Sequence, residues 1–201
     1  MLSRIQHRVE GAFEASAGLF RKAGLSPNSL TMLGFASTFV VFLLYSDGLR
    51  SGLENGSAVL ALLLGSFFDA LDGAMARRYQ LASKIGGVLD SVLDRFGELL
   101  LYSGLAIGRL VDVRLALWAL AVSFMVSYVR ARAESEGISM KGVGIAERPE
   151  RLLILLASTA LHPFYPWALV GGTVIIALLS SVTLVQRVRK IGISVEMDDQ
   201  R

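Results

Sequence analysis

The sequence predicts an all-α polytopic membrane protein with six transmembrane helices and an N-terminal interfacial amphipathic helix. Two observations predict this fold class. Hydrophobic residues make up 53% of the 201 residues, which is too many for an ordinary soluble domain. Several apolar runs also approach the roughly 20 residues that a helix needs to cross a hydrocarbon core of about 30 Å. We therefore expect one membrane domain over residues 25–190, preceded by residues 1–24 and followed by a short tail at 191–201.

The segment at 1–24 is expected to form the amphipathic helix. Apolar residues recur near helical spacing from Leu2 to Phe20, and Arg4 and Arg8 lie opposite them. Such a helix lies in the membrane interface or packs against the protein itself, and the sequence leaves both arrangements open. The segment lacks the continuous apolar core of a cleavable signal peptide.

Six apolar runs follow this segment, and each predicts one membrane-spanning helix. The first begins after Ser26-Pro27-Asn28, which is a good helix start because proline suits the first turn. The fifth begins near Pro149 for the same reason and is the shortest of the six. The expected spans are residues 29–46, 57–77, 85–107, 113–133, 150–162 and 166–186.

The distribution of positive charge predicts the orientation of these spans. Six spans place both termini on one side, together with the loops at 78–84 and 134–149. Of the 20 Lys and Arg residues, only Arg50, Arg109 and Arg114 fall on the opposite side. Because positive residues concentrate in cytoplasmic loops, we expect a protein of the cell membrane with both termini and the active site facing the cytoplasm. The asymmetry also predicts anionic ligands on that side.

Four carboxylates lie at the cytoplasmic ends of the second and third spans. Asp69 and Asp72 are three residues apart, and Asp90 and Asp94 are four apart, so each pair projects from one helical face. The short link at 78–84 makes the two helices antiparallel neighbours, which brings the pairs together. Because a charged side chain in the membrane costs roughly 2.5–3.5 kcal/mol, it indicates a functional site. These acids are therefore the predicted catalytic centre.

The same acids predict a site for divalent cations. Carboxylates so close together repel one another unless a cation neutralises them, and neither histidine nor cysteine lies nearby. Oxygen ligands alone favour hard ions such as Mg²⁺, Mn²⁺ or Ca²⁺ over zinc. Two ions would match the charge and form a clamp suited to phosphoryl chemistry. Glu98 continues the face of the third span and is expected to pair with Arg95 rather than to bind a metal.

Small residues and an arginine accompany the acids. Gly73 follows Asp72 directly, and its missing side chain is expected to let a ligand approach the backbone. Gly87 is expected to serve helix packing instead. Arg77 adds a fixed cation that can pair with phosphate. An anchor at the membrane surface is the alternative role for arginines here, and it is the interpretation that we adopt for Arg78.

The spacing of these residues forms a motif. It reads D-x2-D-G-x2-A-R-x8-G-x3-D-x3-D between Asp69 and Asp94. This motif resembles the signature of the CDP-alcohol phosphatidyltransferase family, and the resemblance extends over residues 25–190. It implies a divalent-metal-dependent enzyme of phospholipid biosynthesis that transfers a phosphatidyl-type group from a CDP-linked lipid to an alcohol and releases CMP. It also implies the six-span fold, a juxtamembrane helix and a homodimer.

The resemblance implies roles for individual residues. Asp69, Asp72 and Asp90 would hold two ions, Mg²⁺ or Mn²⁺, and Asp94 would contribute to the metal site or act as the catalytic base. The residues expected to bind the CDP-linked lipid are Pro27, Thr31, Asp69, Gly73, Ala76 and Arg77.

Basic residues outside the motif indicate the second substrate. The segment S-Y-V-R-A-R-A-E ends the fourth span, and E-R-P-E-R-L opens the fifth. Their arginine pairs suit an anionic acceptor, although a salt bridge with a nearby glutamate is the alternative for any one of them. The two segments resemble the branch of phosphatidylinositol phosphate and archaetidylinositol phosphate synthases, which implies inositol phosphate as the acceptor. The expected acceptor site is Ser127, Arg130, Arg132, Arg148 and Arg151.

Three other interpretations stay open on the sequence alone. Glycerol 3-phosphate as the acceptor requires a similar basic site. A cation transporter explains acids in the membrane but not the adjacent Arg77, and a non-catalytic scaffold leaves the acids unexplained. No motif for nucleic-acid binding occurs, so the expected partners are the CDP-linked lipid, inositol phosphate and membrane lipids. The lipid itself, diacylglycerol or ether-linked archaeol, also stays open.

Overall fold

A computed structural model gives the structure of residues 16–199, with side chains described up to Glu196. Within these residues the regular structure is entirely helical. A helical segment at 16–22 comes first. The helices that follow are α2 (Pro27–Asp47), α3 (Gly52–Arg78), α4 (Lys84–Ile107), α5 (Val113–Ser135), α6 (Arg148–Leu161) and α7 (Ala168–Asp199).

Serine side chains determine where three of these helices begin. Ser26, Ser51 and Ser83 have extended backbone angles, and each hydroxyl accepts a hydrogen bond from a backbone N–H of the first turn. Such a cap satisfies a donor that the first turn leaves free and is worth about 1 kcal/mol. Pro27 and Pro149 lie in the first turns of α2 and α6, as their positions in the sequence predict.

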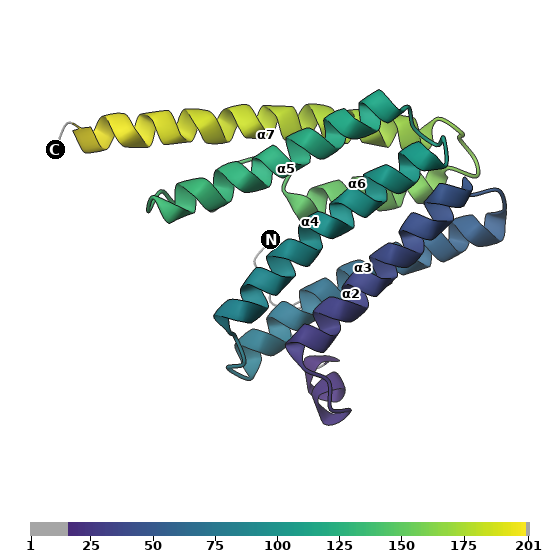
Figure 1. Ribbon diagram of the computed structural model, residues 1–201, viewed down its shortest axis with the longest axis horizontal. Helices are drawn as coiled ribbons and strands as arrows, with labels where there is room; N and C mark the ends of the chain where they lie inside the picture. Colours follow the sequence, from purple (N-terminus) through teal and green to yellow (C-terminus); the bar gives the residue numbers. More distant parts are fainter. Residues whose placement is uncertain (1–15, 200–201) are drawn as a thin grey trace, which may run out of the picture.

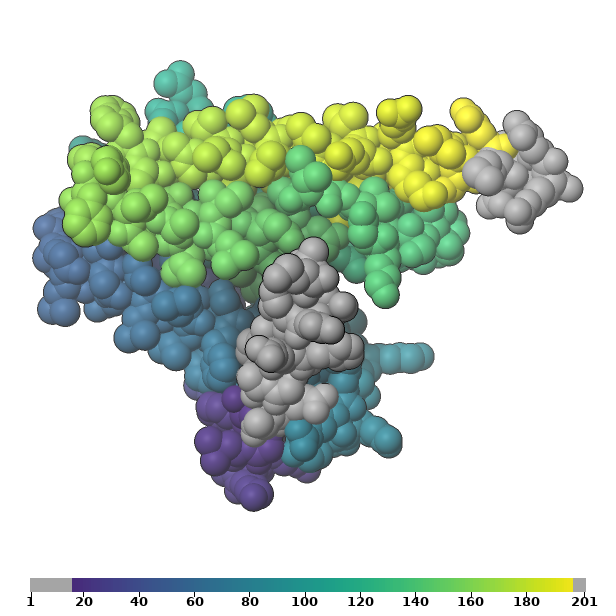
Figure 2. Space-filling model, turned by 180° about the vertical axis from the view of Figure 1, so that it is seen from behind, coloured from purple at the N-terminus to yellow at the C-terminus, as the bar shows by residue number. Residues whose placement is uncertain are grey.

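The helices form two groups that meet at one end of the molecule (Figure 1). In the first group α2 packs against α3 and α4, and in the second α7 packs against α5 and α6. Contacts of α3 with α6 and of α4 with α5 join the two groups. The groups diverge toward the end that holds the α3–α4 loop. Seen from behind, the yellow C-terminal part of α7 extends away from the blue and purple helices of the first group (Figure 2).

The end where the groups meet is closely packed. A Cβ atom on Gly104 of α4 would lie 3.0 Å from the backbone oxygen of Phe42, so a side chain at this position would push α2 away from α4. The Tyr45 hydroxyl lies 2.5 Å from Oγ1 of Thr159, and the Asn55 amide donates to the Thr159 carbonyl at 2.9 Å. These buried hydrogen bonds hold α2, α3 and α6 together at this end. The cavities described below lie toward the divergent end instead.

Four helices, α2, α3, α5 and α7, are long and apolar enough to cross a membrane. Many large apolar side chains on the helices are exposed, which suits a surface that faces lipid. Helix α6 has 14 residues and is about 21 Å long at a rise of 1.5 Å per residue. Helix α4 is longer but carries Lys84, Asp90, Asp94, Arg95 and Glu98. These features are those of an integral membrane protein, and each of the six expected spans corresponds to a helix.

The two ends of the chain can be compared with the sequence-based prediction in part. Residues 1–15, most of the predicted amphipathic helix, lie outside the described residues. The ring centroid of Phe20 lies 6.3 Å from that of Phe67 and 6.1 Å from that of Phe68, and both of these residues are on α3. The helical segment at 16–22 therefore packs against α3. At the other end the sixth span was expected to stop at residue 186, but α7 continues through most of the expected tail to Asp199.

Candidate active site

Three carboxylates meet where α3 and α4 face each other. Asp69 comes from α3, Asp90 and Asp94 come from α4, and each offers an oxygen atom within 4.8 Å of the others. The α3–α4 connection at 79–83 is short, which keeps the helices antiparallel and the acids together. Three carboxylates without histidine or cysteine are the kind of donor set that Mg²⁺ and Mn²⁺ prefer. The residues present therefore fit the predicted divalent cation.

The fourth predicted acid, Asp72, is not part of this three-carboxylate group. Its Oδ2 atom accepts a hydrogen bond of 2.6 Å from the Thr31 hydroxyl of α2. The residue is buried and lines a separate cavity together with Asp90. Asp90 thus connects Asp72 with the other acids, and the predicted four-acid site is divided into a cluster of three and one neighbour.

The cavity beside Asp72 has a volume of about 160 Å³ and lies between α2, α3 and the start of α4. It collects four of the residues predicted to bind the CDP-linked lipid, namely Pro27, Thr31, Gly73 and Ala76. Arg77 lies directly beside it, because a Cβ atom on Gly73 would be 3.2 Å from the Arg77 Nη1 atom. Five residues of the sequence motif, Asp72, Gly73, Ala76, Gly86 and Asp90, therefore line one space next to the acid cluster.

A larger cavity of about 950 Å³ reaches the acids from between the two groups of helices. Asp69, Asp90 and Asp94 form part of its wall, so it shares the whole three-carboxylate cluster. Its other charged lining includes five arginines and two glutamates and comes from α4, α5, α7 and the start of α6. Among the lining residues are Ser127, Arg130, Arg148, Arg151 and Arg187.

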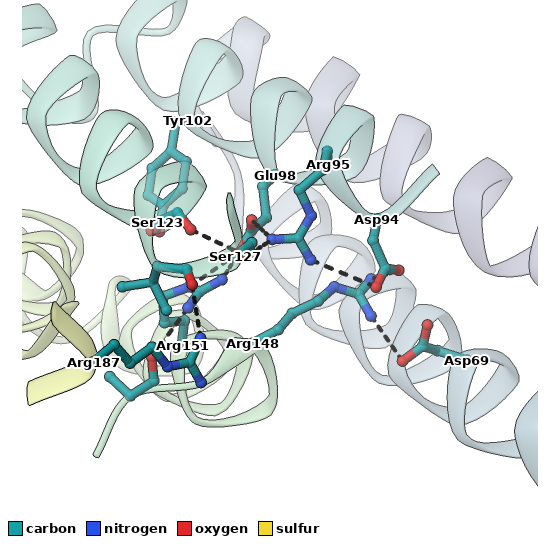
Figure 3. A network of polar contacts seen from close by, with 12 residues as sticks. Asp69, Asp94, Arg95, Glu98, Tyr102, Ser123, Ser127, Arg148, Arg151 and Arg187 are labelled. Atoms are coloured by element: carbon teal, nitrogen blue, oxygen red, sulfur yellow. Dashed lines mark hydrogen bonds and ion pairs between the residues drawn. The ribbon is translucent and has the colours of Figure 1, made fainter. Parts of the chain in front are cut away.

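Arg148, the first residue of α6, extends to the acid cluster (Figure 3). Its Nη1 atom lies 2.8 Å from Oδ2 of Asp69, and its Nη2 atom lies 2.8 Å from Oδ1 of Asp94. Its Nε atom is buried and has no hydrogen-bond partner among the described residues. A single guanidinium therefore joins α6 to α3 and α4 and contacts two of the three clustered carboxylates.

A buried ion-pair network lies next to this contact (Figure 3). Glu98 accepts hydrogen bonds of 3.0 Å from Arg95 Nη1 and from Arg151 Nε. Arg95 also donates to the Ser127 hydroxyl, and Arg151 donates to the Ala146 carbonyl at 3.1 Å. The predicted pairing of Glu98 with Arg95 is confirmed. Arg151 is buried within this network, so its donors bind groups of the protein itself.

Glu147 makes a second set of ion pairs on the opposite wall. Its Oε1 atom accepts hydrogen bonds from Arg187 Nη2 at 2.6 Å and from Arg130 Nη1 at 3.4 Å. Arg187 is almost completely buried and also donates to the carbonyl of Val126 at 2.7 Å, which fixes its guanidinium in the wall. We call the part of the cavity lining formed by Arg130 and Arg187 the basic wall. The carboxylate of Glu147 lies between these two arginines.

Comparison with known proteins identifies the family of this chain. The model of the CDP-alcohol phosphatidyltransferase family matches residues 25–186. The chain belongs to this family. It is 36% identical to the archaetidylinositol phosphate synthase of Pyrococcus horikoshii over 197 residues, 98% of this chain and 100% of that protein. It is 37% identical to the phosphatidylinositol phosphate synthase of Mycolicibacterium smegmatis over 188 residues, 86% of this chain and 80% of that protein.

Solved structures of a phosphatidylinositol phosphate synthase have the same fold. Phosphatidylinositol phosphate synthase of Mycobacterium tuberculosis with CDP-DAG bound matches with a TM-score of 0.76 and 31% identity, covering 89% of this chain and 92% of that chain. Its complex with manganese and citrate matches with a TM-score of 0.76 and 31% identity, covering 89% and 88% of the two chains. The range matched by the family model, residues 25–186, includes the three clustered acids.

Two arginines of this CDP-alcohol phosphatidyltransferase differ from the sequence-based expectation. Arg132, expected in the acceptor site, is exposed, pairs with Glu136 and does not line the large cavity. Arg187 lines that cavity but was not among the predicted site residues. Arg187 lies one residue beyond the expected end of the sixth span, and an arginine at such a position suggests an anchor at the membrane surface. Its position directly after an apolar run was the only signal in the sequence.

Proposed function

We propose that this CDP-alcohol phosphatidyltransferase transfers a phosphatidyl-type group, diacylglycerol phosphate or archaeol phosphate, from a CDP-linked lipid to a hydroxyl of inositol phosphate and releases CMP. The observation that carries the proposal is the meeting of two cavities at Asp90, one lined by residues of the family motif and the other by arginines. The names of the similar archaetidylinositol phosphate and phosphatidylinositol phosphate synthases support inositol phosphate as the acceptor.

Asp69, Asp90 and Asp94 are the proposed metal ligands, and Asp72 is the fourth carboxylate of the site. Two divalent ions, Mg²⁺ or Mn²⁺, would match the charge of these four acids. When bound, the metal neutralises the diphosphate and stabilises negative charge that develops on its oxygens. The manganese complex of the solved relative supports a divalent cation as the cofactor.

The smaller cavity is the proposed site of the CDP moiety. Pro27, Thr31, Gly73 and Ala76 line it, and Arg77 stands beside it as a cation for phosphate. Asp69 faces the diphosphate from the metal cluster in this arrangement. The hydrogen bond from Thr31 to Asp72 positions that carboxylate between α2 and α3. The solved relative with CDP-DAG bound supports a CDP-linked lipid as the donor.

The larger cavity is the proposed acceptor site. Ser127, Arg130, Arg148 and Arg187 line it and bind the acceptor phosphate, since guanidinium groups form paired hydrogen bonds with phosphate oxygens. Arg151 lines the same cavity, but its partner Glu98 is buried and, unlike Glu147, does not line the cavity, so we assign Arg151 a positioning role. Arg132 is left out of this set because it points away from the cavity wall toward Glu136.

The transfer step follows from the order of these sites. The acceptor hydroxyl attacks the lipid-side phosphorus of the CDP-linked lipid, a new oxygen–phosphorus bond forms, and the bond from that phosphorus to the CMP oxygen breaks. Asp94 belongs to the acid cluster and also lines the acceptor cavity, and in this proposal it accepts the proton of the hydroxyl. CMP leaves with the electron pair of the broken bond.

The same proposal includes the arrangement in the membrane. Helices α4 and α6 complete six spans, because Asp90, Asp94 and Arg95 of α4 line the cavity and α6 packs against α3 and α7. The excess of Lys and Arg on the side of the acid cluster supports an active site and two termini at the cytoplasmic face of the cell membrane. The family resemblance supports a homodimer.

The test is an assay of CMP release from a CDP-linked lipid in detergent micelles. Inositol phosphate is expected to support release and glycerol 3-phosphate to support little; the opposite preference would identify the second alcohol as the substrate. A chelator should stop release, and added Mg²⁺ should restore it. Asp94→Asn should lose transfer but still bind the CDP-linked lipid, and equal loss of both would contradict its assignment as the base.

A further inference from the structure

Two consecutive residues at the start of α6 contact the site with opposite charges. Arg148 bridges Asp69 and Asp94, with both nitrogen–oxygen distances at 2.8 Å. Glu147, its neighbour, lies 2.6 Å from the buried guanidinium of Arg187. Because the two side chains leave one helix terminus in different directions, α6 contacts the acid cluster and the basic wall at the same time.

Each of these contacts occupies groups that a ligand would need. The Arg148 guanidinium binds oxygen atoms of two of the three clustered carboxylates, and a cation at the cluster must compete with it for them. Glu147 places its carboxylate between Arg130 and Arg187, where a phosphate would otherwise pair with the same nitrogens. The buried Nε of Arg148 has no acceptor among the described residues, so its hydrogen bonding is not completed by the acids.

We propose that Glu147 and Arg148 are a charge-exchange pair, in which Arg148 occupies the metal subsite and Glu147 the acceptor-phosphate subsite until the metal and the phosphate replace them. This inference rests on the proposed function, since it requires a metal at the acids and a phosphate at the arginines. Arg148 lines the large cavity, so once the metal displaces it from the carboxylates it can donate to the phosphate.

The exchange makes the two ligands cooperative. A phosphate that attracts Arg148 frees the carboxylates for the metal, and a metal at the carboxylates frees Arg148 for the phosphate. Such coupling is reciprocal by thermodynamic necessity, so each ligand must change the affinity of the other by the same factor. The affinity of the metal is therefore expected to depend on the acceptor even when no CDP-linked lipid is present and no transfer can take place.

The test measures Mn²⁺ binding to the full-length protein in detergent micelles by electron paramagnetic resonance of free Mn²⁺. Inositol phosphate should tighten Mn²⁺ binding by about tenfold in the unchanged protein, since one charge-assisted hydrogen bond is worth a factor of this order. Arg148→Gln, without inositol phosphate, should bind Mn²⁺ about tenfold more tightly than the unchanged protein and lose most of the enhancement. Glu147→Gln should bind inositol phosphate more tightly in isothermal titration calorimetry.

Matched variants separate this effect from a general loss of charge or of folding. Arg114→Gln removes an exposed arginine that pairs with Asp112 at the other end of the molecule, and it should leave Mn²⁺ binding unchanged. Arg148→Lys keeps the charge but cannot bridge both carboxylates with a planar group. It should bind Mn²⁺ with an affinity between those of the unchanged protein and Arg148→Gln, and it serves as the test if Arg148→Gln does not purify as a single species.

The possible failures are distinguishable. If Arg148→Gln binds Mn²⁺ no more tightly than the unchanged protein, or if inositol phosphate has the same effect on both, the charge exchange is refuted and the proposed function is untouched. If the unchanged protein does not bind Mn²⁺ at all, the proposed metal site is refuted, and the exchange is refuted with it.

Discussion

Replacing Glu98 with glutamine tests whether the buried ion pairs between α4 and α6 hold the site together. The side chains of Glu98 and Arg151 are 4% and 2% exposed. Glu98 also pairs with Arg95 at 3.0 Å, so one carboxylate compensates two arginines. Glutamine keeps the size of the side chain but removes its charge. The variant therefore leaves Arg151 buried without its ion-pair partner.

The structure gives the size of the expected effect. Breaking a buried ion pair by removing one partner costs about 3–5 kcal/mol, since the remaining charge is uncompensated where water cannot reach it. Glu136→Gln is the matched control because the pair of Glu136 with Arg132 is exposed, and an exposed pair contributes about 0–1 kcal/mol. Replacing Arg151 with methionine in the Glu98→Gln background removes the uncompensated charge and should recover part of the lost stability.

Thermal unfolding in detergent micelles, followed by circular dichroism, measures these differences. For a chain of this length about 1 kcal/mol shifts Tm by roughly 2–4 °C. Glu98→Gln should therefore lower Tm by about 6 °C or more, and Glu136→Gln by less than about 4 °C. Equal shifts for the two single variants, or a double variant no more stable than Glu98→Gln, would refute the reasoning.

Two further predictions concern the acceptor cavity and the closely packed end of the molecule. Arg130→Gln should raise KM for inositol phosphate by about tenfold or more, since a hydrogen bond to a charged group is worth about 1.5–3 kcal/mol. Arg132→Gln should change this KM by less than about twofold. Initial rates of CMP release measure both values, and equal effects would contradict the assignment of Arg130 to the acceptor site. Tyr45→Phe removes the buried hydrogen bond to Thr159 and should lower the free energy of unfolding by about 1 kcal/mol. The exposed Tyr128→Phe should change it by less than about 0.5 kcal/mol, and a larger loss for Tyr128→Phe would contradict the assignment.

The acid cluster was predictable because local geometry determines it. The helical period places Asp90 and Asp94 on one face of α4. The short link between the second and third spans brings Asp69 of α3 opposite that face. Asp72 shows the limit of this reasoning. It lies only three residues after Asp69, but its hydrogen bond to Thr31 comes from another helix, and sequence spacing carries no information on that contact.

The basic wall was harder to predict because arginines have several roles in membrane proteins. Arg130 and Arg132 are two residues apart and look equivalent in the sequence, yet the helical period turns them to different sides of α5. Only Arg130 lines the large cavity. Arg187 was missed because α7 continues past the expected end of its span, which places this arginine in the wall.

The divergent end of the helices carries many charged side chains, and each of them needs a partner of opposite charge. A lone charge in an apolar bundle is costly, whereas a charge with an opposite partner is tolerated. Around the large cavity Arg148 pairs with acids and Glu147 with arginines, so the two ends of the cavity carry opposite charge before any ligand binds. A cation and a phosphate are the ligands that can replace such partners without leaving a buried charge uncompensated. The ion pairs that make the divergent end stable thereby also define the chemistry of what it binds.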